Sequence, residues 1–433
     1  MSDTVDTAVA SVVAPLADEL SGLRDVYVDL HRHPELSRQE IRTSSIVADR
    51  LARSGYEVTS DVGGTGVVGV LRNGDGPIVA LRADMDALPV REQTGLSYAS
   101  EVVARDPSGR DVPVMHACGH DVHTTCLIGA ADLLARAKGD WRGTLMWLAQ
   151  PAEETITGAR EMLRDGLYER FGTPSVVLGQ HVAPLPAGLI LHRPGPVMAA
   201  TLSLDVTIHG RGGHGSRPET TIDPVVVGAF IVTRLQTIVS REIEPLQAAV
   251  VTVGEFHAGT KSNVIPGEAR LAINVRSYDD KVQRHVVSAI ERIVRAEADA
   301  ARCPRPPEIT RSYGGPVTSN DAEVVERVKT AHLAWFGSDR VRDMPMPGMG
   351  SEDFGLFAHV DGDPESPATI PTGFWFWGGA SAEQVAAAPG TTLREKVASL
   401  PSNHHPGFMV DPEPTLRTGV EALAVAALAY LDR

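Results

Sequence analysis

The chain has 433 residues, of which 42% are hydrophobic and 22% charged, and its formal net charge is −15. These values are typical of a globular protein too long for one ordinary core, so we expect two domains. The acidic balance and the lack of basic patches argue against nucleic acid or an anionic membrane as a partner. The sequence has no run of about 18 apolar residues, so we expect no membrane span. Three cysteines occur in all, which favours reduced thiols and a cytoplasmic location.

The first part of the chain alternates helical and strand-like patterns. Apolar residues recur with helical spacing over residues 15–30 and 37–54. Short apolar runs then predict strands at residues 67–71, 78–81, 145–148 and 176–178, with an amphipathic helix over 124–137. This alternation predicts an α/β fold with a mostly parallel sheet.

Potential metal ligands follow three of these predicted strands. Asp84 and Asp86 follow the second strand, Glu153 and Glu154 the third, and His181 the fourth. In open α/β sheets, ligands bind at the carboxyl ends of the strands. We therefore expect these side chains to converge.

The pattern changes near residue 196. Strand-like segments at 202–208, 250–256, 269–275 and 308–313 alternate with helices at 223–241 and 281–298. This β-α-β-β-α-β order predicts a ferredoxin-like α+β domain inserted into the first domain. Residues 1–195 and 315–433 would form the catalytic domain, closed by a helix over 416–431, and residues 196–314 the insert.

Residues 115–125 hold the densest group of possible ligands. Cys118 and His120 lie two positions apart, so both can face one ion, and Gly119 lets the chain turn closely between them. A buried cysteine beside a helix cap at Asp121 is the structural alternative. Together with Glu153-Glu154, His181 and His404-His405, this segment could bind one or two divalent cations, as in a metal-dependent hydrolase.

The adjacent carboxylates can divide the work of hydrolysis. Successive side chains diverge, so one glutamate can bind metal while its neighbour faces a bound water as general base. The alternative is that the two glutamates belong to an acidic turn exposed to solvent.

The predicted insert also contains candidate site residues. A glycine-rich turn at residues 211–216 presents His214, which could reach a developing oxyanion or be part of a plain connection. Asn263 and Arg276 could hold a substrate carboxylate, although Arg276 could equally form a surface ion pair.

Eight segments, taken in order, resemble the family of aminoacylases, hippurate hydrolases, auxin-amide hydrolases and related metallocarboxypeptidases. They are LHRHPE at 30–35, LRADMDALP at 81–89, HACGHD at 116–121, QPAEE at 150–154, GGH at 212–214, SNVIP at 262–266, GSEDF at 350–354 and NHHP at 403–406. They span nearly the whole chain, and eight matches in the family's order are specific.

The resemblance implies a dinuclear metal site, which would hold Zn, Mn, Co or Ni, and a homodimer formed through the insert. By matching position, the metal ligands would be Cys118, His120, Glu154, His181 and His404. Either His404 or His405 could ligate, and His404 is preferred. By the same matching, the catalytic residues would be Glu153 as general base and His214, the substrate binders Asn263 and Arg276, and the residue orienting the ligands Asp86.

The resulting expectation is a metal-dependent amidohydrolase that cleaves the amide bond of N-acyl amino acids or similar small amides. Three alternatives remain open at this point. The first is a dipeptidase or carboxypeptidase that acts on small peptides. The second is a binding protein with a structural metal, which would have no need of Glu153 beside a ligand. The third is an enzyme that uses Cys118 as a thiol nucleophile.

Overall fold

The computed structural model describes residues 9–364 and 366–432. Contacts along the backbone divide the chain into two compact units. The first consists of Met1–Val197, Ser319–Met346 and Asp353–Arg433, and the second of Met198–Thr318 and Pro347–Glu352. The short segment Pro347–Glu352 also lies in the second unit, and its sequence pattern did not indicate this placement.

The first unit is built on an eight-stranded sheet in the order β1-β2-β6-β3-β7-β18-β8-β17. The predicted strands are β2 (Gly66–Asn73), β3 (Ile78–Asp84), β6 (Gly143–Gln150) and β7 (Val176–Pro186). β3 is parallel to both β6 and β7, and β7 is parallel to β18 (Thr372–Ala380). The β1 edge (Glu57–Val62) is antiparallel, as is the pairing of β2 with β6. The mostly parallel centre of the sheet confirms the predicted fold class.

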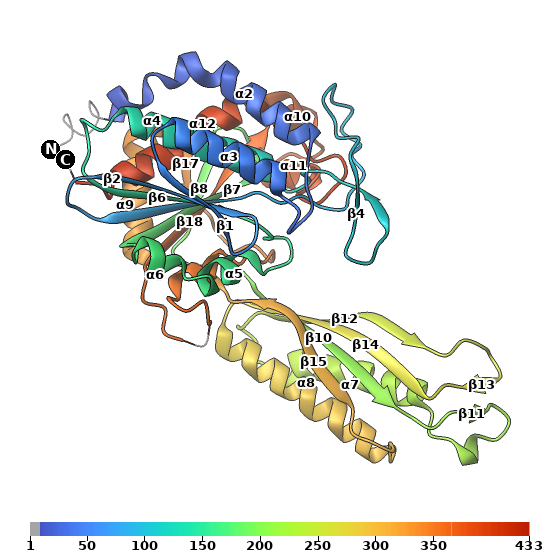
Figure 1. Cartoon of the computed structure of the whole chain (residues 1–433). Coiled ribbons are helices and arrows are strands. Elements are labelled where there is room, and N and C mark those ends of the chain that lie inside the picture. The colour runs from blue at the N-terminus through green and yellow to red at the C-terminus, as the bar shows by residue number, and fades with distance from the viewer. Residues whose placement is uncertain (1–8, 365, 433) are drawn as a thin grey trace. The chain divides into compact units, whose positions relative to one another are not determined.

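Helices bury the faces of this sheet. α2 (Leu16–Arg32), α3 (Ile41–Arg53), α4 (His120–Arg136) and α12 (Pro412–Leu428) lie together on one side (Figure 1). The strand interiors are therefore almost continuously apolar, as expected for strands covered on both faces. The remaining elements of this unit are β4 (Val103–Arg105), β5 (Asp111–Pro113), α5 (Gly158–Arg164), α6 (Leu167–Phe171), β8 (Ile190–His192), β9 (Gly195–Met198), β16 (Thr318–Asn320), α9 (Ala322–Phe336), β17 (Val341–Asp343), η2 (Phe354–Ala358), α10 (Ala382–Ala387) and α11 (Leu393–Ser399).

The second unit has the element order expected for the insert. β10 (Ala200–His209), β12 (Ala249–Ala258), β14 (Glu268–Ser277) and β15 (Glu308–Gly315) form an antiparallel sheet in the order β12-β14-β10-β15. α7 (Pro224–Arg241) and α8 (Asp280–Ala300) pack their apolar sides onto it. The Asp223 carboxylate caps α7 by accepting from Val225 N, as its position before Pro224 predicts. The short elements β11 (Gly213–His214), η1 (Pro218–Thr220) and β13 (Val264–Ile265) complete this unit.

One helix of the described chain, α7, is long and apolar enough to cross a membrane by length and composition alone, which is weak support for a span. Its residues Val227, Ile231, Leu235 and Ile238 are buried against the sheet of the second unit.

A buried histidine pair lies in the core of the first unit. His192 Nε2 donates to His332 Nδ1 at 2.9 Å, and His332 Nε2 donates to the Ala422 carbonyl at 3.0 Å. Both rings pack against Trp375. Burial lowers the pKa of His332 to about 4 and holds the pKa of His192 well below its usual range. Both imidazoles are therefore neutral in the folded chain at neutral pH.

This pair is expected to destabilise the fold in acid. Unfolded histidine titrates near ~6.5, so as the pH falls the unfolded chain takes up protons before the folded chain does. For His332 the free energy of unfolding should fall by about 3 kcal/mol between roughly pH 6.5 and pH 4. Denaturant unfolding at several pH values measures this slope. The double variant His192→Gln, His332→Gln should flatten it, whereas His257→Gln, at an exposed histidine, should not. Equal slopes in all three proteins would contradict the assignment.

Candidate metal centre

The carboxyl edge of the sheet carries the predicted site. Asp84, at the end of β3, pairs in register with Gln150, at the end of β6. His181 lies within β7, further along than the predicted strand end. α4 begins at His120, four residues earlier than expected, so this histidine occupies the first turn of a helix. Gly119 precedes it with φ +83°, and a Cβ there would lie 2.4 Å from Val182 Cγ1, so only glycine fits between Cys118 and His120.

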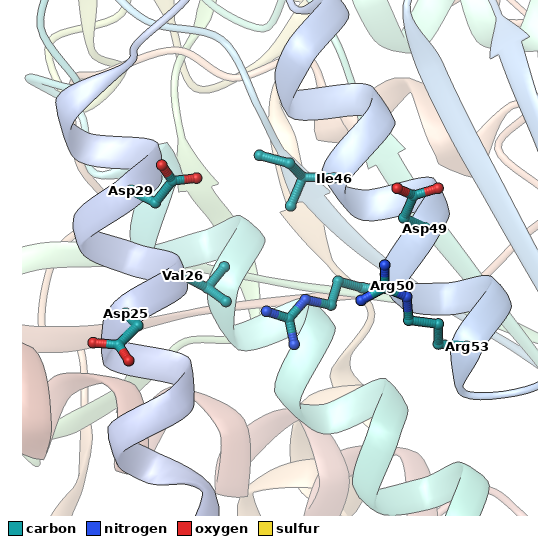
Figure 2. A pocket seen from close by; sticks show the side chains of 7 residues that line it. All are labelled: Asp25, Val26, Asp29, Ile46, Asp49, Arg50 and Arg53. Carbon is teal, nitrogen blue, oxygen red and sulfur yellow. The ribbon is translucent and has the colours of Figure 1, made fainter.

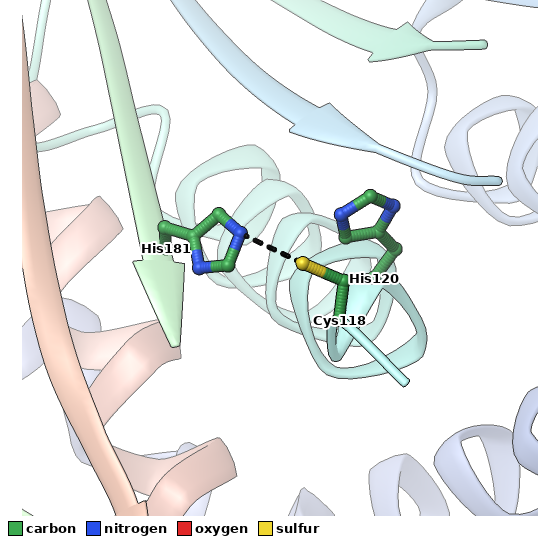
Figure 3. Close-up of side chains that lie close together, drawn as sticks. All are labelled: Cys118, His120 and His181. Atoms are coloured by element: carbon green, nitrogen blue, oxygen red, sulfur yellow. Dashed lines mark hydrogen bonds between the residues drawn. The ribbon is translucent and has the colours of Figure 1, made fainter. Parts of the chain in front are cut away.

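Cys118, His120 and His181 converge on one point (Figure 3). Cys118 Sγ lies 3.4 Å from His181 Nε2. His181 Nδ1 donates to the Val182 carbonyl at 2.7 Å, which fixes the tautomer and leaves Nε2 as the basic nitrogen. A thiol and a bare imidazole nitrogen thus face each other, as ligands of a shared ion do.

His120 and the two glutamates form the next group. His120 Nδ1 donates to the Asp86 carbonyl at 2.8 Å, so Nε2 is the ring nitrogen that could face a cation. That Nε2 lies 3.8 Å from Glu154 Oε1 and 3.9 Å from Glu153 Oε2. Among the residues that the structure describes, neither His120 Nε2 nor Glu154 Oε1 has a hydrogen-bond partner, although both atoms are buried. Buried polar atoms are rarely left unpaired, and these two are suited to a cation between them.

Asp86 holds the turn that carries both glutamates. Its Oδ1 accepts from Glu153 N at 3.1 Å, its Oδ2 accepts from Glu154 N at 3.0 Å, and Ser37 Oγ donates to Oδ2 at 2.6 Å. Its Oδ1 also lies 3.3 Å from His120 Nδ1. One buried carboxylate therefore orients a histidine and two glutamates.

The two adjacent histidines near the carboxyl end have different environments. His404 Nε2 lies 3.3 Å from Glu154 Oε2, and His404 forms a ligand-like group with Cys118 and Glu154. His404 adopts φ +70°, a conformation that is strained for a side chain of this kind. His405 Nδ1 instead accepts from Gly407 N, and His405 belongs to none of the ligand-like groups found among the described residues.

The electrostatics of the site favour a positive charge. Burial disfavours ionisation of His120, but Asp84 and Asp86 outweigh it and raise the pKa of His120 to about 10. Burial and then the Glu154 and Glu153 carboxylates raise the pKa of the Cys118 thiol well above its ordinary value. A thiolate here needs a cation beside it, which argues against Cys118 as a free nucleophile.

A polar network not identified from the sequence lies beside the candidate ligands. The fully buried Arg82 donates to Gln150 Oε1 and Asp84 Oδ2, each at 2.7 Å, and Gln150 Nε2 donates to Asp353 Oδ1 at 2.7 Å.

His123 Nδ1 donates to Asp84 Oδ1, and its Nε2 accepts from Val182 N, so neither nitrogen of His123 is free for metal. The helical spacing of His123 from His120 was the sequence signal that could have predicted its place beside the site.

Other residues near the motifs have positioning contacts. Asn403 Nδ2 donates to the Cys118 and Val182 carbonyls at 3.1 and 3.2 Å, so it joins the segments that carry two candidate ligands. His31 bonds to Asp121 Oδ2 and Glu92 Oε1 and is not in the ligand-like groups, which fits a structural role.

The second unit brings two of its three candidates together. His214 pairs with Val264 across the β11–β13 ladder, and Gly215 N donates to the Asn263 carbonyl at 2.9 Å. Ser216 N donates to His214 Nδ1 at 3.1 Å. The neutral ring therefore carries its proton on Nε2, where it can be donated to an anionic oxygen.

Arg276 lies elsewhere in this unit. It is near the end of β14, whereas β11 and β13 lie beyond the start of that strand (Figure 1). At ~3.3 Å per residue, the length of β14 separates them by roughly 25 Å. Arg276 Nη1 donates to the Met349 carbonyl at 2.6 Å and to Ser351 Oγ at 3.2 Å. Within one chain, Asn263 and Arg276 therefore do not share a carboxylate.

A groove between α2 and α3 is separate from these groups. Its lining residues are Asp25, Val26, Asp29, Ile46, Asp49, Arg50 and Arg53 (Figure 2). α2 contributes Asp25 and Asp29, and α3 contributes Asp49 with the two arginines; none of these carboxylates belongs to a ligand-like group among the described residues.

A mostly parallel sheet whose carboxyl edge gathers candidate sulfur, imidazole and carboxylate ligands beside a further carboxylate is the arrangement expected of a metal-dependent hydrolase. The family model "Peptidase family M20/M25/M40" matches residues 80–396, and the chain belongs to that family. It is an amidohydrolase enzyme of the type expected from the sequence, which confirms the resemblance.

Relatives of known name cover most of the chain. A hippurate hydrolase of Campylobacter jejuni is 38% identical over 333 residues, which are 76% of this chain and 83% of the relative. An N-acetylcysteine deacetylase of Bacillus subtilis is 36% identical over 87% of this chain and 93% of its own. The solved structure of the Bacillus subtilis YXEP protein, described as a dinuclear metal binding peptidase, has a TM-score of 0.73 and 30% identity, covering 95% of this chain and 98% of that one.

Proposed function

We propose that the chain hydrolyses the amide bond of N-acyl amino acids or similar small amides at two divalent cations. The observation that carries the proposal is the Asp86-held turn, which presents Glu154, with an oxygen that has no hydrogen-bond partner among the described residues, and Glu153 beside it. A structural metal site needs no such second carboxylate. The names of the two sequence relatives support acyl amino acids as the substrate class.

In this proposal the ligands are Cys118, His120, Glu154, His181 and His404. The mixed S, N and O donors suit zinc, manganese, cobalt or nickel. When bound, the cations would polarise the amide carbonyl and acidify a water molecule. Glu153 takes the proton of that water and delivers it to the leaving amine. His214 Nε2–H donates to the developing oxyanion.

The positions of Asn263 and Arg276 support a site completed by a second subunit. Because Asn263 lies beyond the start of β14 and Arg276 near its end, one substrate carboxylate can contact both only if they come from different chains. The proposed homodimer would supply His214 and Asn263 from one protomer and Arg276 from its partner. The cytoplasmic location is proposed from the three free cysteines.

An apolar surface on the second unit supports the proposed dimer interface. On α7, Val226 and Phe230 are 50% and 61% exposed, and the edge strand β12 exposes Val250 and Phe256. Phe230→Glu is expected to convert a dimer into monomers, because a charge would be buried at the interface. Light scattering after size exclusion measures the mass. Ile41→Glu, at an exposed apolar residue of the first unit, is the control. A Phe230→Glu dimer, or a wild-type monomer, would refute this interface.

A substrate panel tests the function. The protein is loaded with each of the four metals and assayed on acetyl and benzoyl amino acids and on dipeptides. Hydrolysis of acyl amino acids in preference to dipeptides is expected. Preference for dipeptides would favour the peptidase alternative, and activity that survives a chelator would exclude a metal mechanism.

A further inference from the structure

Glu40 is a buried carboxylate that neither the motifs nor the proposed chemistry uses. It is fully buried and directly precedes α3. A residue at this position commonly caps the helix, but the Glu40 side chain makes no cap bond. The amides of Arg42 and Thr43 are bonded instead by the Glu35 carboxylate, at 2.9 and 2.8 Å. The Glu40 carboxylate is therefore directed elsewhere.

Both oxygens of Glu40 are fixed by bonds away from its own helix. Oε1 accepts from Ala152 N at 2.9 Å, and Oε2 accepts from Thr65 Oγ1 at 2.6 Å. Ala152 immediately precedes Glu153 and Glu154, whose amides are bonded to Asp86. Three successive amides of one turn are thus held by two buried carboxylates.

The backbone of this turn needs such support. Ala152 has φ +52° and Ile156 has φ +55°, in the left-handed region that is strained for a residue with a Cβ. Space around the turn is also tight, since a Cβ on Gly158 would lie 1.6 Å from the Pro151 carbonyl oxygen.

The geometry links Glu40 to the direction of the Glu153 side chain. The dihedral angles of Ala152 relate the peptide plane before it to the plane after it. Glu40 fixes the first plane through Ala152 N, and Asp86 fixes the second through Glu153 N. If the first bond is lost, Ala152 can relax toward negative φ, which rotates the segment carrying Glu153 and Glu154.

We propose that Glu40 is a positioning residue for the Glu153-Glu154 pair, acting through the left-handed Ala152. The expected effect of Glu40 on turnover rests on the proposed function, whereas its expected effect on metal binding does not. Loss of an outer hydrogen bond of this kind typically lowers metal affinity or activity about 10- to 100-fold.

The test uses three variants of the full chain. Glu40→Ala should lower kcat about 10-fold or more with little change in KM, and should weaken Zn²⁺ binding, measured by competition with a chromophoric chelator, by a similar factor. Glu40→Gln retains an acceptor for Ala152 N and an amide for Thr65, so it should restore most of both values. Glu35→Ala removes a glutamate from the same helix end, so it should lower stability and leave kcat and Zn²⁺ affinity near those of the wild type.

Two results would overturn the positioning role. One is a Glu40→Ala protein with wild-type Zn²⁺ affinity, and the other is a Glu35→Ala protein that loses as much affinity as Glu40→Ala. If the wild type hydrolyses none of the amides, the proposed function fails, whereas the Zn²⁺ titration still decides the role of Glu40.

Discussion

Glu153→Ala is expected to reduce kcat by about 10²- to 10⁴-fold, the usual contribution of a general base. The carboxylate lies in the site with its Oε2 3.9 Å from His120 Nε2, and its backbone amide is fixed by Asp86. Removing the side chain leaves the five proposed ligands intact. The metal content should therefore stay at the wild-type value while turnover is lost.

The neighbouring glutamate provides the matched control for this prediction. Glu154→Ala removes a proposed ligand whose Oε1 lies 3.8 Å from His120 Nε2 and whose Oε2 lies 3.3 Å from His404 Nε2. It should lose both metal and turnover. Steady-state kinetics with elemental analysis of both proteins separates the roles. If Glu153→Ala retains activity, or if the two variants lose metal equally, the division between base and ligand is wrong.

Asp86→Ala should have the second largest effect. The carboxylate accepts from Ser37, Glu153 and Glu154 and lies beside His120 Nδ1, so its loss releases a histidine and the glutamate turn together. Metal affinity is expected to fall about 10- to 100-fold, and activity should fall with it. Excess metal should restore part of the activity, because the ligands themselves remain.

Two further variants check the origin of this effect. Asp86→Asn keeps one acceptor but replaces the other with an amide donor, so it should lie between the wild type and Asp86→Ala. Asp49→Ala removes an exposed carboxylate from the α2–α3 groove and should leave metal affinity unchanged. Unchanged affinity in Asp86→Ala would show that the ligands hold their positions without it.

Much of the fold was predictable because buried strands can be recognised from their runs of apolar residues. β3 and β6 are short, mostly apolar runs that end in polar residues, and the insert has clear alternation and a capped helix. β18 was missed, although it lies centrally in the sheet beside β7. Its aromatic residues lie between glycines, and glycine weakens a strand pattern. Helix α9 was also missed.

The motifs that carry the proposed ligands could be identified from the sequence, but the contacts that support them could not. Cys118 and His120 stand out by their spacing, whereas Glu40 is one acidic residue among many until the fold brings it to Ala152. The separation of Asn263 from Arg276 could have been expected, because the predicted strand at 269–275 lies between them, as β14 does in the structure. Contacts between distant segments depend on tertiary structure, which local patterns do not encode.

Metal stoichiometry tests the central claim that distant segments of the chain form one metal centre. The wild type and the Cys118→Ala and His404→Ala variants are loaded with Zn²⁺, dialysed and subjected to elemental analysis. The wild type should retain two ions per chain, and each variant should retain fewer. A wild type that retains none, or variants that retain as much metal as the wild type, would contradict a shared site.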